Sequence, residues 1–251
     1  MIIIKIGGSV ITDKNSKYPK LNKKNLKRVC KEICEVMPFP LILVHGAGSF
    51  GHPIVKKYDI IANPNKKGFC IVHYWVKKLN LYVCRYLLKY GMDVVSIQPS
   101  SCIIASDGFI DYFNVKIIER YLEKEIVPVL YGDIVLDKSL EFSVISGDQI
   151  VRYLGEKMKA NKIILATDVD GVYDKDPKKH KDAKLIKRIK PEDKIKLKDF
   201  KEDVTGGMAG KVSELLKLAE KGVKSEIVNA KKKNRLKKLL LGKRVRRTII
   251  G

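Results

Sequence analysis

The sequence has no long hydrophobic run: none of its apolar stretches approaches the ~18 residues of a membrane-spanning helix. Its first residues, "MIIIKIGG", form a run that is too short for a secretory signal and has no cleavage site. The five cysteines are an odd number and form no C-x-x-C pair, which argues against a disulfide framework. We therefore expect a soluble cytoplasmic protein whose cysteines are small core residues in a reducing compartment.

Acidic residues are scarce relative to basic ones, since 51 Lys and Arg against 28 Asp and Glu give a formal net charge of +23. The segment 231–247, "KKKNRLKKLLLGKRVRR", has no acid at all. Two interpretations stay open: a lysine-rich surface of the kind found in heat-adapted proteins, or a polyanion partner. No aromatic residue is interleaved with this run and no RNA-binding signature appears, which disfavours nucleic-acid binding as the main function. The same field would attract a phosphorylated small substrate.

Apolar runs of strand length alternate with segments of helical periodicity, such as those around 26–37 and 212–219. Strands that are apolar almost throughout, separated by amphipathic helices, predict an α/β fold: a three-layer sandwich with a mainly parallel central sheet. Two further segments, "SDGFIDYF" (106–113) and "GDIVLDKSLEFS" (132–143), are typical of short hairpins outside that sheet. The predicted sheet strands are Ile2–Ile6, Leu41–His45, Val94–Gln98, Ile126–Leu130, Lys162–Ala166, Glu226–Val228 and Arg247–Ile250.

Glycine turns follow several of these strands or open the helices after them, as in "KIGGS", "HGAGS", "SGDQ", "TDVDGVY" and "TGGMAGK". The carboxyl ends of parallel strands share one edge of a sheet, where ligands bind. Glycine turns and helix N-termini gathered at that edge present many backbone N–H donors. Such a site suits a long anion such as a nucleoside triphosphate.

The loop "HGAGSFGH", residues 45–52, matches two phosphate-binding patterns incompletely. It lacks the acid that a dinucleotide-binding loop needs about 20 residues later, and it lacks the lysine of a P-loop. Lysines come instead from elsewhere: Lys5 in a buried strand, and Lys14 and Lys211 in or beside glycine turns. A carboxylate at Asp148 would hold these lysines in place until a phosphate arrives, which is a phosphoryl-transfer arrangement. The alternative for Lys5 is a lysine that reaches solvent from a strand end.

Taken in order, "KIGGSVIT", "HGAGSFGH", "SGDQ", "TDVDGVYDKDP" and "TGGMAGKV" resemble the amino-acid kinase superfamily over nearly the whole chain. Within it, the ending "GSFGH" resembles the isopentenyl phosphate kinases, with the fosfomycin kinases as near relatives that share the histidine. The resemblance implies the amino-acid kinase fold and transfer of the γ-phosphoryl group of ATP to isopentenyl phosphate, giving isopentenyl diphosphate for isoprenoid biosynthesis. It also implies Mg²⁺ that bridges the ATP phosphates, without a dedicated set of protein ligands for the metal, and a homodimer.

The same resemblance implies roles for individual residues. The ATP site would comprise Lys5, Gly7, Gly8, Ser9, Gly48, Asp168, Gly207 and Lys211. The acceptor phosphate would be held by Ala47, where the family more often has glycine, His52 and Gly147. Catalysis would depend on Lys14, His52, Lys5 and Asp148. The acceptor would bind in a lobe of about residues 1–160, and ATP in a lobe of about residues 161–251.

A hydrocarbon tail on the acceptor would need an apolar pocket beyond His52. The segment 69–87 offers Phe69, Val72, Trp75, Val76 and Leu79, and we expect Trp75 or a neighbour to cap that pocket. Two other functions stay open. One is a related kinase for a phosphonate or another small phosphate or carboxylate, and the other is a basic nucleotide- or RNA-binding protein of the same fold.

Overall fold

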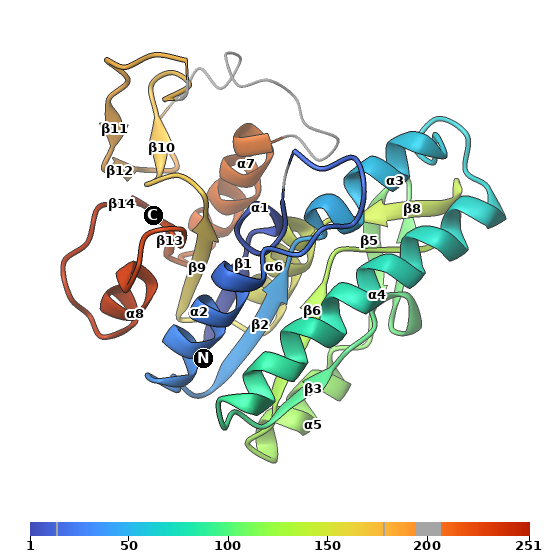
Figure 1. The fold of residues 1–251 in the computed structure, drawn as a ribbon, viewed down its shortest axis with the longest axis horizontal. Coiled ribbons are helices and arrows are strands. Elements are labelled where there is room, and N and C mark those ends of the chain that lie inside the picture. The colour runs from blue at the N-terminus through green and yellow to red at the C-terminus, as the bar shows by residue number, and fades with distance from the viewer. Residues whose placement is uncertain (14, 178, 194–206) are drawn as a thin grey trace.

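The apolar strands of the sequence form one eight-stranded sheet at the centre of the molecule (Figure 1). The structure is a computed structural model that describes residues 1–13, 15–177, 179–193 and 207–251. The strand order is β12-β14-β13-β9-β1-β2-β6-β3, and every neighbouring pair is parallel except β13 and β14. The mainly parallel sheet is therefore confirmed. Its strands are β1 (Ile2–Ile6), β2 (Leu41–His45), β3 (Val94–Ser96), β6 (Val127–Tyr131), β9 (Lys162–Thr167), β12 (Arg188–Ile189), β13 (Ser225–Asn229) and β14 (Arg247–Ile250).

Helices cover both faces of this sheet, because successive side chains of each strand point to opposite faces. On β1, Ile3 packs toward one core and Ile4 toward the other. The Ile4 side is covered by α1 (Gly8–Ile11), α2 (Lys23–Cys34), α4 (Lys66–Lys89) and α8 (Arg235–Leu240). The Ile3 side is covered by α5 (Lys116–Glu123), α6 (Gly147–Lys157) and α7 (Gly207–Ala219). Figure 1 shows α2 and α4 lying across one face, which completes the predicted three-layer sandwich.

Both predicted hairpins form, and they join into a single four-stranded sheet of order β5-β4-β7-β8. Its strands are β4 (Ile103–Ser106), β5 (Phe109–Phe113), β7 (Asp133–Asp137) and β8 (Glu141–Ile145). Asp137 links the two turns, since its carboxylate accepts hydrogen bonds from the backbone N–H of Gly108 at 2.9 Å and of Ser139 at 2.9 Å. Burial alone would raise the pKa of Asp137, but these backbone donors outweigh it and lower the pKa to about 2.

The remaining elements are short. They are α3 (His52–Lys57), the one-turn helices Gly48–Phe50 and Pro99–Ser101, and the two-stranded sheet of β10 (Val172–Tyr173) and β11 (Leu185–Ile186). β3 ends at Ser96 although the sequence predicted a strand to Gln98. Gln98 keeps an extended backbone, but Pro99, which has no N–H to donate, begins the turn Pro99–Ser101. Among the described residues, no helix has both the length and the apolar character of a membrane span.

Candidate functional site

A cleft of about 560 Å³ opens at the edge where β1, β2, β6 and β9 end. Because these strands are parallel, the loops that follow them meet there. The cleft brings together all the residues that the sequence singled out for the site, apart from Lys14, which lies outside the described residues. Those lining it are Lys5, Gly7, Gly8, Ser9, Ala47, Gly48, His52, Gly147, Asp148, Asp168, Gly207 and Lys211.

The first two glycine loops touch each other on one side of the cleft. A Cβ added to Gly8 would lie 2.3 Å from the backbone nitrogen of Gly48, so only glycine allows this approach. Gly48 itself has a left-handed φ of +52°. The hydroxyl of Thr12 joins the loops further, because it donates to the carbonyl of Gly8 at 2.8 Å and accepts from the N–H of Ser49 at 3.0 Å. The two loops therefore form one unit.

Lys5 and Lys211 meet on a single carboxylate at the floor of the cleft. The alternation of β1 places Lys5 on the same face as Ile3, which is the face that α6 covers. Its Nζ lies 2.6 Å from Oδ2 of Asp148, the second residue of α6. Lys211, in the first turns of α7, places its Nζ 3.5 Å from the same oxygen and 3.1 Å from the carbonyl of Gly207. Lys5 is 5% exposed, so it pairs inside the protein and does not reach solvent.

Burial and charge act in opposite directions on this cluster. Burial is the largest influence on Lys5 and lowers its pKa to about 8, although the charge of Asp148 opposes this change. Burial alone would raise the pKa of Asp148, but Lys5 and Lys211 outweigh it and hold that pKa below its usual value. The carboxylate thus stays ionised at neutral pH, and it keeps two cations beside the cleft in the absence of a ligand.

Two helices begin at the cleft and direct their N-terminal ends to it. Gly147 and Gly207, the first residues of α6 and α7, both line the cleft. In α6 a capping box fixes the start: Gln149 N–H donates to the hydroxyl of Ser146, and Ser146 N–H donates to the Gln149 side chain. The positive ends of two helices add to the lysines, and such ends favour phosphate groups.

The two histidines of "HGAGSFGH" have different environments. His45 ends β2 and is fully buried, and burial lowers its pKa to about 4. Asn80 donates to its Nε2 at 3.2 Å, and its Nδ1 faces the carbonyl of Gly46 at 3.2 Å, so His45 is a neutral anchor for the loop. His52 is the first residue of α3 and lines the cleft beside Ala47 and Gly51. Of the two, only His52 faces the position where a ligand would bind.

On the nucleotide side of the predicted site, the sequence analysis missed the role of Asp170. Its neighbours Asp168, Val169 and Gly171 line the cleft. Asp170 turns away from it to pair with Arg235 and Arg246 and to accept a hydrogen bond from Asn229 Nδ2 at 2.9 Å. "TDVDGVY" marks this loop in the sequence, but its partners lie 59 residues or more along the chain, beyond the reach of local patterns.

The apolar residues that line the cleft are only in part those predicted for the tail pocket. Val72 and Val76 of α4 line the cleft, together with Val55, Val144 and Ile145. Phe69, Trp75 and Leu79 are not among the lining residues, whereas Val76, the neighbour of Trp75, is, so the expectation that Trp75 or a neighbour caps the pocket now rests on Val76. The reason is helical geometry, since residues four apart share one face of α4 while Trp75 is rotated toward Phe50, 6.1 Å away between ring centres.

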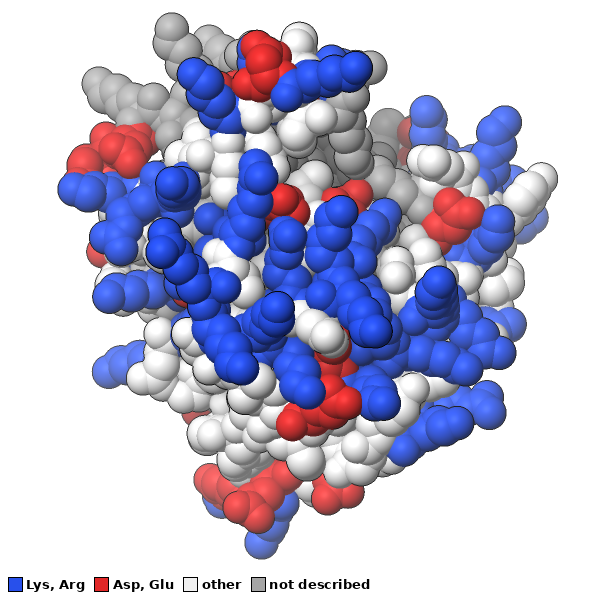
Figure 2. Space-filling model, turned by 60° about the vertical axis from the view of Figure 1, so that its left-hand side comes forward, with Lys and Arg blue, Asp and Glu red and all other residues white. Residues whose placement is uncertain are grey.

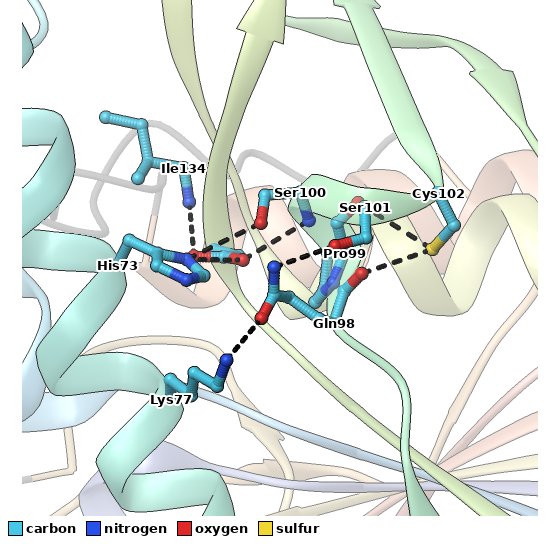
Figure 3. A network of polar contacts seen from close by, with 9 residues as sticks. His73, Lys77, Gln98, Pro99, Ser100, Ser101, Cys102 and Ile134 are labelled. Atoms are coloured by element: carbon cyan, nitrogen blue, oxygen red, sulfur yellow. Dashed lines mark hydrogen bonds and ion pairs between the residues drawn. The ribbon is translucent and has the colours of Figure 1, made fainter.

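A polar network lies at this apolar end of the cleft (Figure 3). Asp133 lines the cleft but is only 1% exposed. Its carboxylate accepts from the N–H of Ile134 at 2.9 Å and of Ser100 at 3.3 Å, and it lies 3.2 Å from Nδ1 of His73. Lys77, one turn along α4 from His73, donates to the Gln98 side chain at 2.8 Å. The network fastens α4 and the Pro99–Ser101 turn to β7, and the sequence alone gave no signal for it.

The cleft as a whole is suited to binding phosphate groups. It combines three lysines (Lys5, Lys179 and Lys211), a histidine, glycine loops and helix N-termini with an apolar wall. The described residues contain no group of three or more His, Cys, Asp or Glu side chains that could hold a metal ion.

Comparison with known proteins agrees with this geometry. Residues 1–229 match the Amino acid kinase family. The chain is 48% identical to the isopentenyl phosphate kinase of Methanothermobacter thermautotrophicus, over 100% of this chain and 98% of that protein. It is 37% identical to the isopentenyl phosphate kinase of Methanocaldococcus jannaschii, over 96% and 95% of the two chains. A solved structure described as "X-ray structures of isopentenyl phosphate kinase" superposes with a TM-score of 0.91, at 46% identity and with both chains fully covered. The chain belongs to the amino acid kinase family, and within it to the group of these isopentenyl phosphate kinases.

Proposed function

We propose that the protein is a kinase that transfers the γ-phosphoryl group of ATP to isopentenyl phosphate, giving isopentenyl diphosphate and ADP. The names of its relatives support this substrate. The observation that carries the proposal is the composition of one cleft, in which two lysines share the carboxylate of Asp148 while His52 and an apolar wall lie at the other end. A phosphate with a short hydrocarbon tail would use both the charged and the apolar part of the cleft.

The reaction needs no general base, because the acceptor phosphate is already an anionic nucleophile. One of its oxygens forms a bond to the γ-phosphorus of ATP, while the bond from that phosphorus to the β,γ-bridging oxygen breaks and ADP leaves. The work of the protein is to bring two anions together and to stabilise the charge of the transferring group. Lys5 and Lys211 supply positive charge on the ATP side, and Asp148 keeps both in place. We assign charge stabilisation at the transferring group to Lys14 as well.

His52 would donate a hydrogen bond to the acceptor phosphate, with backbone N–H groups of Ala47 and Gly147 beside it. Residues 1–160 would then form the acceptor lobe and residues 161–251 the ATP lobe. The ATP site would also include four residues of the acceptor lobe: Gly7, Gly8, Ser9 and Gly48. Mg²⁺ would be held by the phosphates of ATP, and it would supply further neutralisation of their charge.

The direct test is to incubate the protein with Mg-ATP and isopentenyl phosphate and to measure ADP and the diphosphate. Turnover in moderate salt is the expected result. A small phosphonate serves as the competing acceptor, and faster turnover with it would assign the protein to the fosfomycin-like alternative. Absence of turnover with both acceptors, together with RNA retention that falls steeply as salt rises, would favour the non-enzymatic alternative.

Substitution at His52 tests the acceptor site separately. His52→Ala should raise the KM for isopentenyl phosphate at least about tenfold, since one charge-assisted hydrogen bond is worth about 1.5–3 kcal/mol, and it should change the KM for ATP much less. His52→Gln, which retains a donor, should recover part of the loss. Equal changes in both KM values would contradict the assignment.

The apolar wall would set the length of the acceptor tail. Val72→Ala and Val76→Ala enlarge the end of the cleft, so both variants should use longer prenyl phosphates better than the wild type does. Trp75→Ala is the control on the same helix, because Trp75 does not line the cleft. Unchanged chain-length preference in both valine variants would count against a tail pocket here.

A homodimer is part of the proposal, and α4 offers a surface for it. Tyr74, Leu81 and Leu88 recur every seven residues along this helix and are 55%, 58% and 55% exposed. Residues seven apart share a helix face, so these three large side chains form one apolar stripe. A second copy of the chain, packed along α4, would remove this stripe from water.

A further inference from the structure

A strongly basic surface lies outside the cleft, on the side of the sheet that α2 and α8 cover. It combines the exposed lysines of α2 (Lys23, Lys24, Lys27 and Lys31) with the exposed lysines and arginines of 231–247, and we call it the basic face. Figure 2 shows blue side chains gathered across the side of the molecule that carries α8 and β14, with few red ones among them. None of these residues lines the cleft.

Direct contacts join the two segments, although they are some 200 residues apart in sequence. Glu32 of α2 accepts a hydrogen bond from the N–H of Asn234 at 2.9 Å. Arg28 donates to the carbonyl of Ala230 at 2.6 Å. Both contacts involve half-buried or buried side chains of α2, so the lysines on its outer side and those of 231–247 are held in a fixed arrangement.

The acidic side chains near the basic face already form ion pairs with lysines and arginines of the same segments. Glu32 is 3% exposed and pairs with Arg28 at 2.7 Å. Glu35 pairs with Lys237 at 2.9 Å, and Asp170 forms ion pairs with Arg235 and Arg246. Within the described part of the chain, no ion pair reaches Lys23, Lys24, Lys27, the three lysines 231–233, Lys238, Lys243 or Arg244. Within those described residues, no acidic side chain therefore neutralises their charge.

Heat adaptation does not account for this pattern. Thermostable surfaces gain from networks in which both signs alternate, whereas a concentration of one sign destabilises the folded state by repulsion. A surface that accumulates unpaired cations is instead typical of one that neutralises the charges of a polyanion.

We propose that the basic face binds the phosphate backbone of a double-stranded nucleic acid without sequence preference. Binding to single strands uses aromatic side chains on which bases stack, and the segments 23–34 and 231–247 contain none. Membrane surfaces favour helices that also insert a group of apolar side chains. The segment 231–247 exposes a single large apolar side chain, Leu241, which does not make such a group. The helix α2 spans about 18 Å, which is enough to follow several phosphates of a duplex.

A matched pair of variants tests the proposal. The face variant replaces Lys23, Lys24, Lys232 and Lys233 with Gln. The control replaces Lys66, Lys67, Lys116 and Lys124 with Gln, and it removes the same charge from exposed lysines of α4, α5 and the turn after α5, which also have no ion pair among the described residues. Binding to a fluorescent 24-base-pair DNA duplex is measured by anisotropy from 50 to 250 mM KCl, and kinase turnover is measured for each protein.

The wild type should bind with an affinity that falls steeply as salt rises. The face variant should bind at least about tenfold more weakly at 50 mM KCl, with a log–log salt slope reduced by about 2–4, close to one per phosphate contact removed. The control should remain within about twofold of the wild type, and turnover should be unchanged in both, which shows that the variants fold.

Several results would overturn the proposal. They are absence of binding by the wild type at 50 mM KCl, equal losses in the two variants, or tighter binding to a single strand of the same length. Binding to vesicles with phosphatidylglycerol but not to the duplex would instead assign the face to a membrane surface. Because turnover is read separately, a failed kinase assay leaves this comparison intact.

Discussion

The charge of Lys5 depends on pH nearer to neutrality than that of an ordinary lysine. Its pKa of about 8 lies below the ordinary 10.5 because the side chain is buried. We predict that kcat/KM for ATP falls as pH rises through about 8, since the neutral amine no longer attracts phosphate. Bound ATP places negative charge beside Lys5, so the decline in kcat should begin at higher pH than the decline in kcat/KM. Initial rates between pH 6 and 10 measure both profiles.

The same titration affects stability in the opposite direction. Between about pH 8 and 10.5 the unfolded chain holds the Lys5 proton more tightly than the folded one does, so the contribution of Lys5 to the free energy of unfolding rises with pH, by up to about 3 kcal/mol. Loss of activity with rising pH is therefore not loss of fold. Asp148→Asn removes the charge that raises the pKa of Lys5, and it should move the decline in kcat/KM to lower pH. If the decline stays in place in that variant, a different group titrates.

Asp133 joins three parts of the fold through one buried carboxylate. Asp133→Ala leaves the N–H groups of Ser100 and Ile134 without their acceptor, so we predict a loss of about 2–4 kcal/mol in the free energy of unfolding. Urea denaturation measures it. Asp133→Asn keeps an acceptor oxygen and should lose less. A difference below about 0.5 kcal/mol between Asp133→Ala and the wild type would show that the network contributes nothing.

At the scale of elements, the contact between the first and second glycine loops is the most constrained feature. A Cβ on Gly48 would lie 2.1 Å from the hydroxyl oxygen of Thr12, and the residue has a φ of +52°. Gly48→Ala should therefore separate the loops and reduce kcat/KM for ATP by about a hundredfold, since displacement by about 1 Å costs that much.

A second glycine distinguishes the effect of the close loop contact from the effect of the left-handed backbone. Gly91 has a φ of +82° but nothing within 4 Å of an added Cβ. Gly91→Ala should lose only about 1 kcal/mol of stability from the left-handed backbone and should keep its activity. Similar activity in Gly48→Ala and Gly91→Ala would mean that the loop contact does not affect the site.

The elements of the central sheet could be predicted because each of their signals is local. β1 and β2 have the bounds that the apolar runs predicted, since a strand buried on both faces has few polar residues. The gathering of Lys5, Asp148 and Lys211 also followed from local features, because each lies at the end of a parallel strand or the start of a helix.

Side-chain rotation and long-range polar partners could not be predicted in this way. Val76 lines the cleft and Trp75 does not, although both are apolar members of α4, because the direction in which the helix faces is set by packing. The partners of Asp170 and the joining of two hairpins by a parallel contact between Ala105 and Asp137 depend on elements far apart in sequence. Such contacts require the tertiary fold to be known.

For the whole molecule, the net charge of +23 includes two groups of lysines with different chemistry, those of the cleft and those of the basic face. In the cleft Lys5 is buried and Lys211 half-buried, and both pair with the carboxylate of Asp148, so their charge is fixed for one ligand geometry. On the basic face the lysines are exposed and screened by salt. Salt should therefore weaken binding at the basic face at concentrations that leave turnover nearly unchanged.

Assembly gives the last prediction. Leu81→Lys and Leu88→Lys place charges in the apolar stripe of α4, so the double variant should be monomeric at concentrations at which the wild type is a dimer. Light scattering coupled to size-exclusion chromatography measures the mass. Leu136→Lys is the control, since Leu136 is 55% exposed on β7 and outside the stripe. Tyr74, Leu81 and Leu88 do not line the cleft, so the monomer should keep its turnover within a few-fold. A wild type that is monomeric at high concentration, or a dimer that survives both substitutions, would exclude α4 as the interface.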